Sequence, residues 1–203
     1  MDTGWAADVH INLSRREMNL KVVYYGPPLS GKTTNLVRIH EFADPSVRGD
    51  LISLATAEDR TLYFDFLRVD LRRINGLTPR VHLYTVPGQP QYEASRRMVL
   101  RGADGVVFVA DSAADRLDEN LRAWQDLTRY LEELDQANCK LPMVVQFNKQ
   151  DVPNALPSST MRYLMHLNGM PAFEAVATQG KGVRNTLRCI LQELISRVEA
   201  EAA

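Results

Sequence analysis

Apolar residues along the chain alternate between two spacings. Short runs rich in Val, Tyr and Phe, which favour strands, alternate with stretches in which apolar residues recur every three or four positions, as in amphipathic helices. Six runs are predicted as strands: Lys21–Tyr25, Thr61–Leu71, Arg80–Val86, Gly105–Ala110, Pro142–Asn148 and Phe173–Ala177. The alternation predicts an α/β fold with a central, mostly parallel six-stranded sheet.

Three longer helices are predicted between and after these strands. The first runs from Lys32 to about Ala43. The other two are marked by apolar stripes at helical spacing: Leu117, Leu121, Trp124, Leu127, Leu131 and Leu134, then Val183, Leu187, Ile190, Leu191, Leu194 and Val198. We interpret both stripes as core positions of helices that flank the sheet on both faces.

No repeat, low-complexity tract or Gly/Ser-rich linker divides the chain. Residues 20–203 are therefore predicted to form a single domain. Residues 1–19 carry several charges and only scattered apolar residues, so we interpret them as an N-terminal extension. Segment Arg48–Arg60 lacks a clear period and is expected to be a loop, of a length that often carries function.

Composition excludes several classes of protein. Lys and Arg number 24 and Asp and Glu 25, so a net charge of −1 leaves no broad basic surface for nucleic acid. The longest apolar run, Val106–Ala110, is much shorter than the roughly 20 residues of a membrane-spanning helix. We expect a cytoplasmic protein without an integral membrane segment. Cys139 and Cys189 have no partner at metal-ligand spacing and are interpreted as inert thiols.

The first candidate for chemistry directly follows the first predicted strand. Residues 26–33 have the spacing of a phosphate-binding loop, with two glycines followed by Lys and Thr. In such a loop Lys32 neutralises the β and γ phosphates and Thr33 offers its hydroxyl to Mg²⁺. Pro27 and Pro28 have no N–H to donate. The predicted nucleotide-binding positions of the loop are Gly26, Leu29, Ser30, Gly31, Lys32, Thr33 and Thr34.

A second motif, Asn148-Lys149-Gln150-Asp151, ends a hydrophobic strand. One carboxylate can accept both adjacent donors of guanine, whereas adenine has an acceptor at N1, so Asp151 predicts selectivity for guanine. Asn148 and Lys149 are predicted to bind the same nucleotide, together with Ala177 and Thr178 at the end of another strand. The alternative for the tetrapeptide is a solvated charged turn.

These motifs carry a resemblance to a known family. The runs GPPLSGKTTNL, LATAEDRTLYFDF, HLYTVPGQPQYEASRR, GVVFVADS, NKQD and EAVAT closely resemble the MglA family of bacterial Ras-like small GTPases, which set cell polarity and motility. The resemblance extends from about Ser14 to Val198. It implies a Ras-like P-loop fold, a GTP/GDP switch, a homodimeric roadblock-type activator, polarity or motility effectors, and recruitment to the cell pole.

The resemblance also assigns residues in the first switch. It implies that Arg60 is an intrinsic arginine finger and that Thr61 binds the nucleotide and Mg²⁺. From the residues alone, Arg60 is more simply a solvated surface arginine.

In the second switch, Gln89 stands where Ras-like enzymes orient the attacking water, and the Gly88 N–H can bind the γ phosphate. Most such enzymes carry an aspartate three residues before this glycine, which organises Mg²⁺ through water. Thr85 stands there, so it is a candidate for that contact and metal binding is expected to be weaker. Pro28 stands where the family usually has glycine, which brings the hydrolysis rate into question.

The sequence therefore predicts a GTPase that is slow without an activator, with Gln89, Arg60 and Lys32 as catalytic residues. One alternative is a nucleotide-locked interaction module with negligible turnover, which Pro28 favours. Another is a P-loop phosphotransferase. The guanine motif argues against it, and the chain has no insertion that would form an acceptor pocket.

Overall fold

The computed structural model describes residues 10–12, 16–54, 64–74, 76–134 and 141–201. Within these ranges eight strands form one sheet in the order β3-β4-β5-β2-β6-β7-β8, and β1 pairs with β2. The strands are β1 (His10–Asn12), β2 (Glu17–Tyr25), β3 (Ile52–Leu54), β4 (Phe64–Asp70), β5 (Thr78–Thr85), β6 (Gly105–Asp111), β7 (Met143–Asn148) and β8 (Ala172–Glu174). The mostly parallel α/β fold is confirmed.

Strand direction brings the predicted motifs to one edge of the sheet. Strands β2, β5, β6, β7 and β8 are parallel, so their carboxyl ends share that edge. Strand β4 runs antiparallel to β5, and Phe66 pairs with Tyr84. The amino end of β4 therefore lies at the same edge, where the register places Asp65 opposite Thr85.

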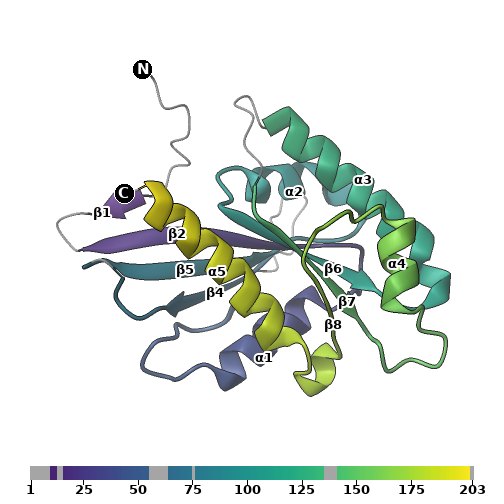
Figure 1. The fold of residues 1–203 in the computed structure, drawn as a ribbon, viewed down its shortest axis with the longest axis horizontal. Coiled ribbons are helices and arrows are strands. Elements are labelled where there is room, and N and C mark those ends of the chain that lie inside the picture. The colour runs from purple at the N-terminus through teal and green to yellow at the C-terminus, as the bar shows by residue number, and fades with distance from the viewer. Residues whose placement is uncertain (1–9, 13–15, 55–63, 75, 135–140, 202–203) are drawn as a thin grey trace.

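Helices cover both faces of the sheet (Figure 1). They are α1 (Lys32–Phe42), α2 (Glu93–Leu100), α3 (Leu117–Leu134), α4 (Ser158–Leu164) and α5 (Val183–Glu201). Helices α1 and α5 pack on one face of the sheet and α2, α3 and α4 on the other. A separate apolar core lies between the sheet and each of these two helix layers. Among the described helices, none is long and apolar enough to cross a membrane.

The alternation of side chains along β2 divides the two cores. Leu20 and Val22 belong to the core under α1 and α5, whereas Val23 belongs to the core under α2, α3 and α4. Trp124 packs edge-on against Phe108 with ring centroids 5.0 Å apart, which confirms the predicted packing face of α3. The exception is Leu134, which is 39% exposed because it is the last residue of α3, beyond the packed turns.

The sheet has two more strands than the six predicted. Strands β1 and β3 have three residues each, too few for a hydrophobic period to be recognised. Part of the predicted loop at 48–60 is thus an edge strand, since Ile52–Leu54 pairs with β4, while 55–60 lies outside the described residues. In the predicted extension, His10–Asn12 pairs with the start of β2, which begins at Glu17 rather than Lys21. Helices α2 and α4 were not predicted from the sequence either, because both are short.

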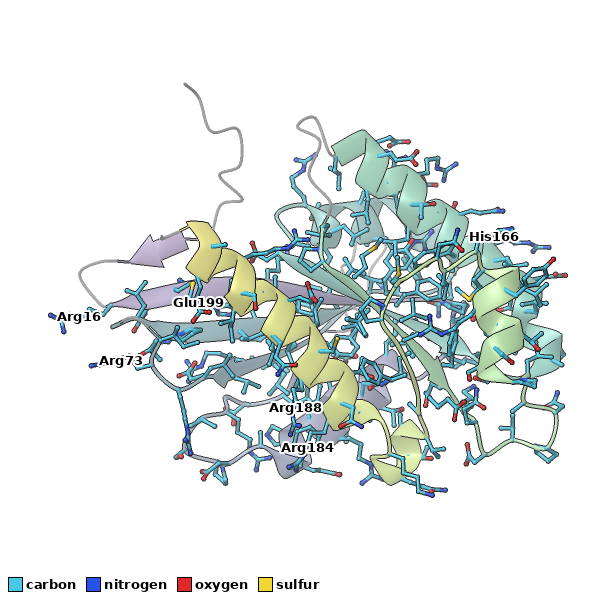
Figure 2. The ribbon with its side chains drawn as sticks, in the orientation of Figure 1. Arg16, Arg73, His166, Arg184, Arg188 and Glu199 are labelled. Atoms are coloured by element: carbon cyan, nitrogen blue, oxygen red, sulfur yellow. The ribbon has the colours of Figure 1, made fainter. Side chains whose placement is uncertain are left out.

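Three exposed arginines mark the outside of the fold. Arg16 precedes β2 and Arg73 follows β4, so both side chains project from the end of the sheet opposite the motifs (Figure 2). Arg184 on α5 lies over the Phe42 ring, 4.6 Å from its centroid, and so packs α5 against the end of α1.

Candidate functional site

The phosphate-binding loop connects β2 to α1 at the carboxyl edge of the sheet. Gly26 directly follows β2, and Lys32, Thr33 and Thr34 form the first turn of α1. Gly31 has φ +101°, and a Cβ there would lie 2.2 Å from Asn148 Nδ2, so the loop can approach the guanine motif this closely only with glycine. Leu29 has φ +62° and is 82% exposed, whereas Ser30 is buried. The Ser30 hydroxyl has no hydrogen-bond partner among the described residues.

Lys32 is a buried cation in this loop. Its Nζ donates to the carbonyl oxygens of Gly26, at 2.9 Å, and Pro27, at 2.6 Å. Burial, together with the nearby Arg96 guanidinium, lowers the pKa of Lys32 to about 7, although the Asp65 carboxylate opposes the shift. Arg96 on α2 is also buried. Two buried cations beside backbone N–H groups fit an anionic group such as phosphate.

Asp65 on β4 is a residue that the sequence reasoning missed. Its carboxylate oxygen Oδ2 accepts the Thr33 hydroxyl at 2.5 Å and the Thr85 hydroxyl at 2.8 Å, and Oδ1 accepts the Ser53 hydroxyl at 2.7 Å. The signal was in the alternation of β4, where the inward positions are 65, 67 and 69. Leu67 and Val69 fill a core, so a carboxylate in the same row indicates a polar partner.

The residues around Asp65 fit a small divalent cation. Mg²⁺ prefers oxygen ligands, and the site combines the Thr33 hydroxyl with a buried carboxylate. Thr85 has no carboxylate to offer, but its hydroxyl donates to Asp65 and accepts the Asp65 backbone N–H at 2.8 Å. Asp65 therefore supplies, from the neighbouring strand, the negative charge that position 85 lacks.

The guanine motif connects three loops. Asn148 Nδ2 donates to the Ser30 carbonyl at 2.8 Å, and its Oδ1 accepts the Ala177 backbone N–H at 2.8 Å. Lys149 Nζ lies 2.6 Å from the buried carboxylate of Asp111 at the end of β6. Asp151 is exposed just past the end of β7, with its carboxylate accessible to a ligand. The phosphate loop and the base-binding segments thus form one continuous site.

Thr178 also lies at this edge, in the segment that follows β8. Its side chain is exposed, and its carbonyl oxygen accepts a hydrogen bond from the Arg38 guanidinium on α1. This bond joins the base-binding segment to the helix that carries Lys32.

The second-switch segment packs directly on the phosphate loop. A Cβ on Gly88 would lie 2.3 Å from the Pro28 nitrogen and 2.6 Å from its Cα, so the two backbones are in close contact. Gln89 is exposed, and its backbone carbonyl accepts a bond from Arg96 at 2.5 Å. The Pro28 carbonyl accepts from Arg116 at 3.0 Å. The predicted residues Arg60 and Thr61 lie outside the described part of the chain.

A parallel sheet with a phosphate loop and a guanine motif at one edge defines a P-loop nucleotide-binding protein of the GTPase class. Residues 7–194 match the model of the ADP-ribosylation factor family, Arf. The chain belongs to this family of Ras-like GTPases.

Comparison with individual proteins agrees with this assignment. The chain is 46% identical to the Mutual gliding-motility protein MglA of Myxococcus xanthus over 93% of its own length and 97% of that protein, which confirms the resemblance found in the motifs. It is 28% identical to ADP-ribosylation factor-like protein 6 of Caenorhabditis elegans, over 77% of this chain and 73% of that one. A match to Elongation factor 4 of Thermus thermophilus, 30% identical over 81% of this chain, spans 27% of that longer protein.

Proposed function

We propose that the protein is a GTP/GDP switch that binds guanine nucleotide with Mg²⁺ and hydrolyses GTP to GDP and phosphate, slowly when alone. The observation that carries the proposal is the double contact of Asn148, which hydrogen-bonds the phosphate loop at Ser30 and the base-binding segment at Ala177. A site connected in this way can bind the phosphates and the base of one nucleotide at the same time. Asp151, exposed beside it, is in position to accept the two guanine donors.

Each side chain has a distinct role in this proposal. Lys32 offsets charge on the β and γ phosphates, and its proton is retained once the phosphates supply negative charge. Gln89, next to the glycine that contacts the phosphate loop, orients the attacking water. Arg60 offsets charge on the transferred group. Backbone N–H groups from Leu29 to Thr34 and at Gly88 bind phosphate oxygens.

Thr33 and Asp65 are the described residues that would hold Mg²⁺, and Thr85 holds Asp65 in place. Thr61 is the remaining proposed contact. When bound, Mg²⁺ offsets the charge of the β and γ phosphates.

We further propose a role in bacterial cell polarity or gliding motility. The support is the 46% identity to a protein named for gliding motility over nearly the whole of both chains. The expected partners are a homodimeric roadblock-type activator and downstream polarity or motility effectors. The expected location is the cytoplasm, with recruitment to the cell pole.

The test is displacement of a fluorescent GDP from the purified protein by unlabelled nucleotides. GTP and GDP should compete, whereas ATP should be weaker by about 10⁴-fold, because adenine leaves the Asp151 carboxylate without its donors. Asp151→Asn should lose affinity for GDP, and Asp115→Asn, an exposed carboxylate that bonds Asn154, is the matched control. Equal displacement by ATP and GTP would refute the proposal.

A second candidate is an interaction module that holds GTP without turnover. The close contact of Gly88 with Pro28 favours it, because a rigid, crowded loop restricts the approach of water. Phosphate release, measured with and without a candidate activator, separates the two candidates. A switch releases phosphate faster with its activator, and a locked module does not.

A further inference from the structure

A chain of buried polar side chains lies beneath the nucleotide site, apart from the motifs described above. Asn35 on α1, Gln146 on β7 and Thr186 on α5 are each completely buried. Asn35 Nδ2 donates to the Gly31 carbonyl at 2.9 Å and to Gln146 Oε1 at 2.8 Å. Gln146 Nε2 donates to Asn35 Oδ1 and to Thr186 Oγ1, both at 3.0 Å. Thr186 Oγ1 donates to the Gly182 carbonyl at 2.9 Å.

This chain of contacts runs beside the one made by Asn148. Gln146 and Asn148 are two residues apart on β7, so their side chains project from the same face of the strand. Asn148 connects Ser30 to Ala177, and the buried chain connects Gly31 to Gly182. Both connections begin in the phosphate loop and end in the segment between β8 and the first turn of α5, which carries the base contacts.

The side of α5 that takes part is the buried one. Arg184 and Arg188, two residues before and after Thr186, are exposed on the outer side of the helix (Figure 2). Thr186 is completely buried, on the helix whose Val183, Leu187 and Ile190 belong to the core under α1 and α5. In this position an apolar pair at 35 and 146 would pack without any need for hydrogen bonds. Replacing both members of a buried polar pair with apolar groups is nearly neutral for stability.

We propose that Asn35, Gln146 and Thr186 are positioning residues that hold the phosphate loop at a fixed distance from the base-binding segment and so slow nucleotide release. This inference rests on the proposed function. The Gly31 and Gly182 carbonyls also accept the backbone N–H groups of Asn35 and Thr186, each at 3.0 Å, so what the side chains add is the link from α1 through Gln146 to α5. Hydrogen bonds are directional, so this link fixes the starts of the two helices relative to each other in a way that apolar packing cannot. A nucleotide bound at both ends is sensitive to that distance, whereas the discrimination between guanine and adenine belongs to Asp151 and is unaffected.

The test compares stability with the dissociation rate of fluorescent GDP. The double variant Asn35→Leu/Gln146→Met replaces both amides with apolar side chains. It should unfold within about 5 °C of the parent, since the pair is replaced as a unit. It should nevertheless release GDP about tenfold faster, the effect of losing one or two such hydrogen bonds. Preference for GTP over ATP should stay unchanged.

Thr186 provides an independent variant with a matched control. Thr186→Val should accelerate release, and Thr186→Ser, which keeps the hydroxyl, should restore the parental rate. Thr128→Val is the control, because Thr128 makes the same bond to the residue four positions earlier but lies on α3, away from the site.

The outcomes separate this inference from the proposed function. If the parent prefers GTP over ATP and the stable double variant releases GDP at the parental rate, the pair only fills the core and the inference is wrong. If the parent itself does not bind guanine nucleotide, the proposed function is wrong and the inference with it.

Discussion

The Thr33 hydroxyl on α1 donates to the Asp65 carboxylate on β4 across 2.5 Å, which joins the phosphate loop to an antiparallel strand of the sheet. The contact exists because β4 runs opposite to β5, so that its amino end reaches the edge where the parallel strands end. Thr85 binds the same carboxylate oxygen at 2.8 Å. Asp65 thus places a carboxylate beside position 85, where most Ras-like enzymes carry an aspartate of their own.

Asp65→Asn is the first prediction. It keeps the size of the side chain and removes its charge, so the variant should lose Mg²⁺ affinity by about 10- to 100-fold, the range seen when residues that support a metal ligand are changed. The measurement is the dissociation rate of fluorescent GDP at increasing Mg²⁺ concentration. Half-maximal slowing of release should require correspondingly more Mg²⁺ in the variant.

Asp70→Asn is the matched control for Asp65→Asn. Asp70 is on the same strand but forms its ion pairs with Arg68 and Arg80, away from the site. If both variants require the same Mg²⁺ concentration as the parent, Asp65 does not serve the metal.

The second prediction concerns Lys32 and pH in the nucleotide-free protein. The unfolded chain holds this proton up to about pH 10.5, whereas the folded protein releases it near pH 7. Between these values the unfolded state binds more protons, so the free energy of unfolding rises with pH, by up to about 1.4 kcal/mol per pH unit from this group. Below pH 7 the buried charge is present in full and destabilises the fold.

Urea denaturation of the parent and of Lys32→Met between pH 6 and 9 checks this prediction. Lys32→Met should be the more stable protein at pH 6, and its advantage should shrink as the pH rises above 7. It should not bind GDP. A difference in stability that is constant across this pH range would show that Lys32 does not release its proton there.

Nucleotide binding should reverse the effect of burial on Lys32. Phosphates beside Nζ favour the charged form, so at pH 8 the binding of GDP should take up nearly one proton at this residue. Calorimetry in two buffers of different ionisation enthalpy measures the uptake directly. The same binding heat in both buffers at pH 8 would contradict the assignment.

Much of the architecture could be predicted because its elements are long and regular. Strands β6 and β7 are buried along nearly their whole length and are rich in Val and Phe, as expected for parallel strands covered on both faces, and the stripe on α3 has a clear helical period. Strands β1 and β3 could not be predicted from three residues each. Their pairing depends on neighbours that are distant in the sequence or lie across a turn, which a local pattern does not record.

The candidate site, like the fold, could be predicted only in part from the sequence. The phosphate loop and the guanine motif have spacings fixed by the ligand, so the sequence alone indicates them. Asp65, Arg96 and the pair Asn35–Gln146 belong to no motif, and their partners become known only once the sheet brings separate elements together. Of these residues Asp65 is the easiest to predict from the sequence, because a carboxylate at an inward position of a strand requires a polar partner.

The third prediction concerns the water-orienting residue. Gln89→Leu should lower single-turnover GTP hydrolysis strongly while the affinity for GTP changes little, because the side chain acts on the attacking water rather than on the bound phosphates. Gln91→Leu, an exposed glutamine two residues on, is the control and should hydrolyse GTP at the parental rate. If the two variants behave alike, Gln89 has no special role.

Arg60→Ala tests the arginine finger expected from the family. Removing such a residue costs roughly 10³- to 10⁵-fold in rate. Hydrolysis stimulated by an activator should fall accordingly, with GTP affinity retained. Stimulated hydrolysis at the parental rate would return Arg60 to the role of a solvated surface charge.

The last prediction is that Pro28 slows hydrolysis in the absence of an activator. The structure places the Gly88 backbone directly against Pro28, so that a Cβ on Gly88 would lie 2.6 Å from the Pro28 Cα. Gln89, the next residue, must reach the γ phosphate past this contact. Catalysis is sensitive to displacements of about 1 Å, which can cost near 10²-fold. The Pro28 nitrogen and Cα that make this contact remain in Pro28→Gly, but the ring carbons attached to them are removed. If those carbons crowd the attacking water, the variant should raise the single-turnover rate.

An opposing effect comes from the backbone freedom that glycine adds. Proline fixes φ near −65° and so preorganises the loop, and its loss could loosen the N–H groups that bind phosphate. Pro28→Ala separates the two effects, because alanine removes the ring without the freedom of glycine. If crowding limits the rate, both variants hydrolyse GTP faster than the parent in single-turnover experiments. If rigidity is what matters, both are equal or slower, the glycine variant is the slower of the two, and the crowding explanation is wrong.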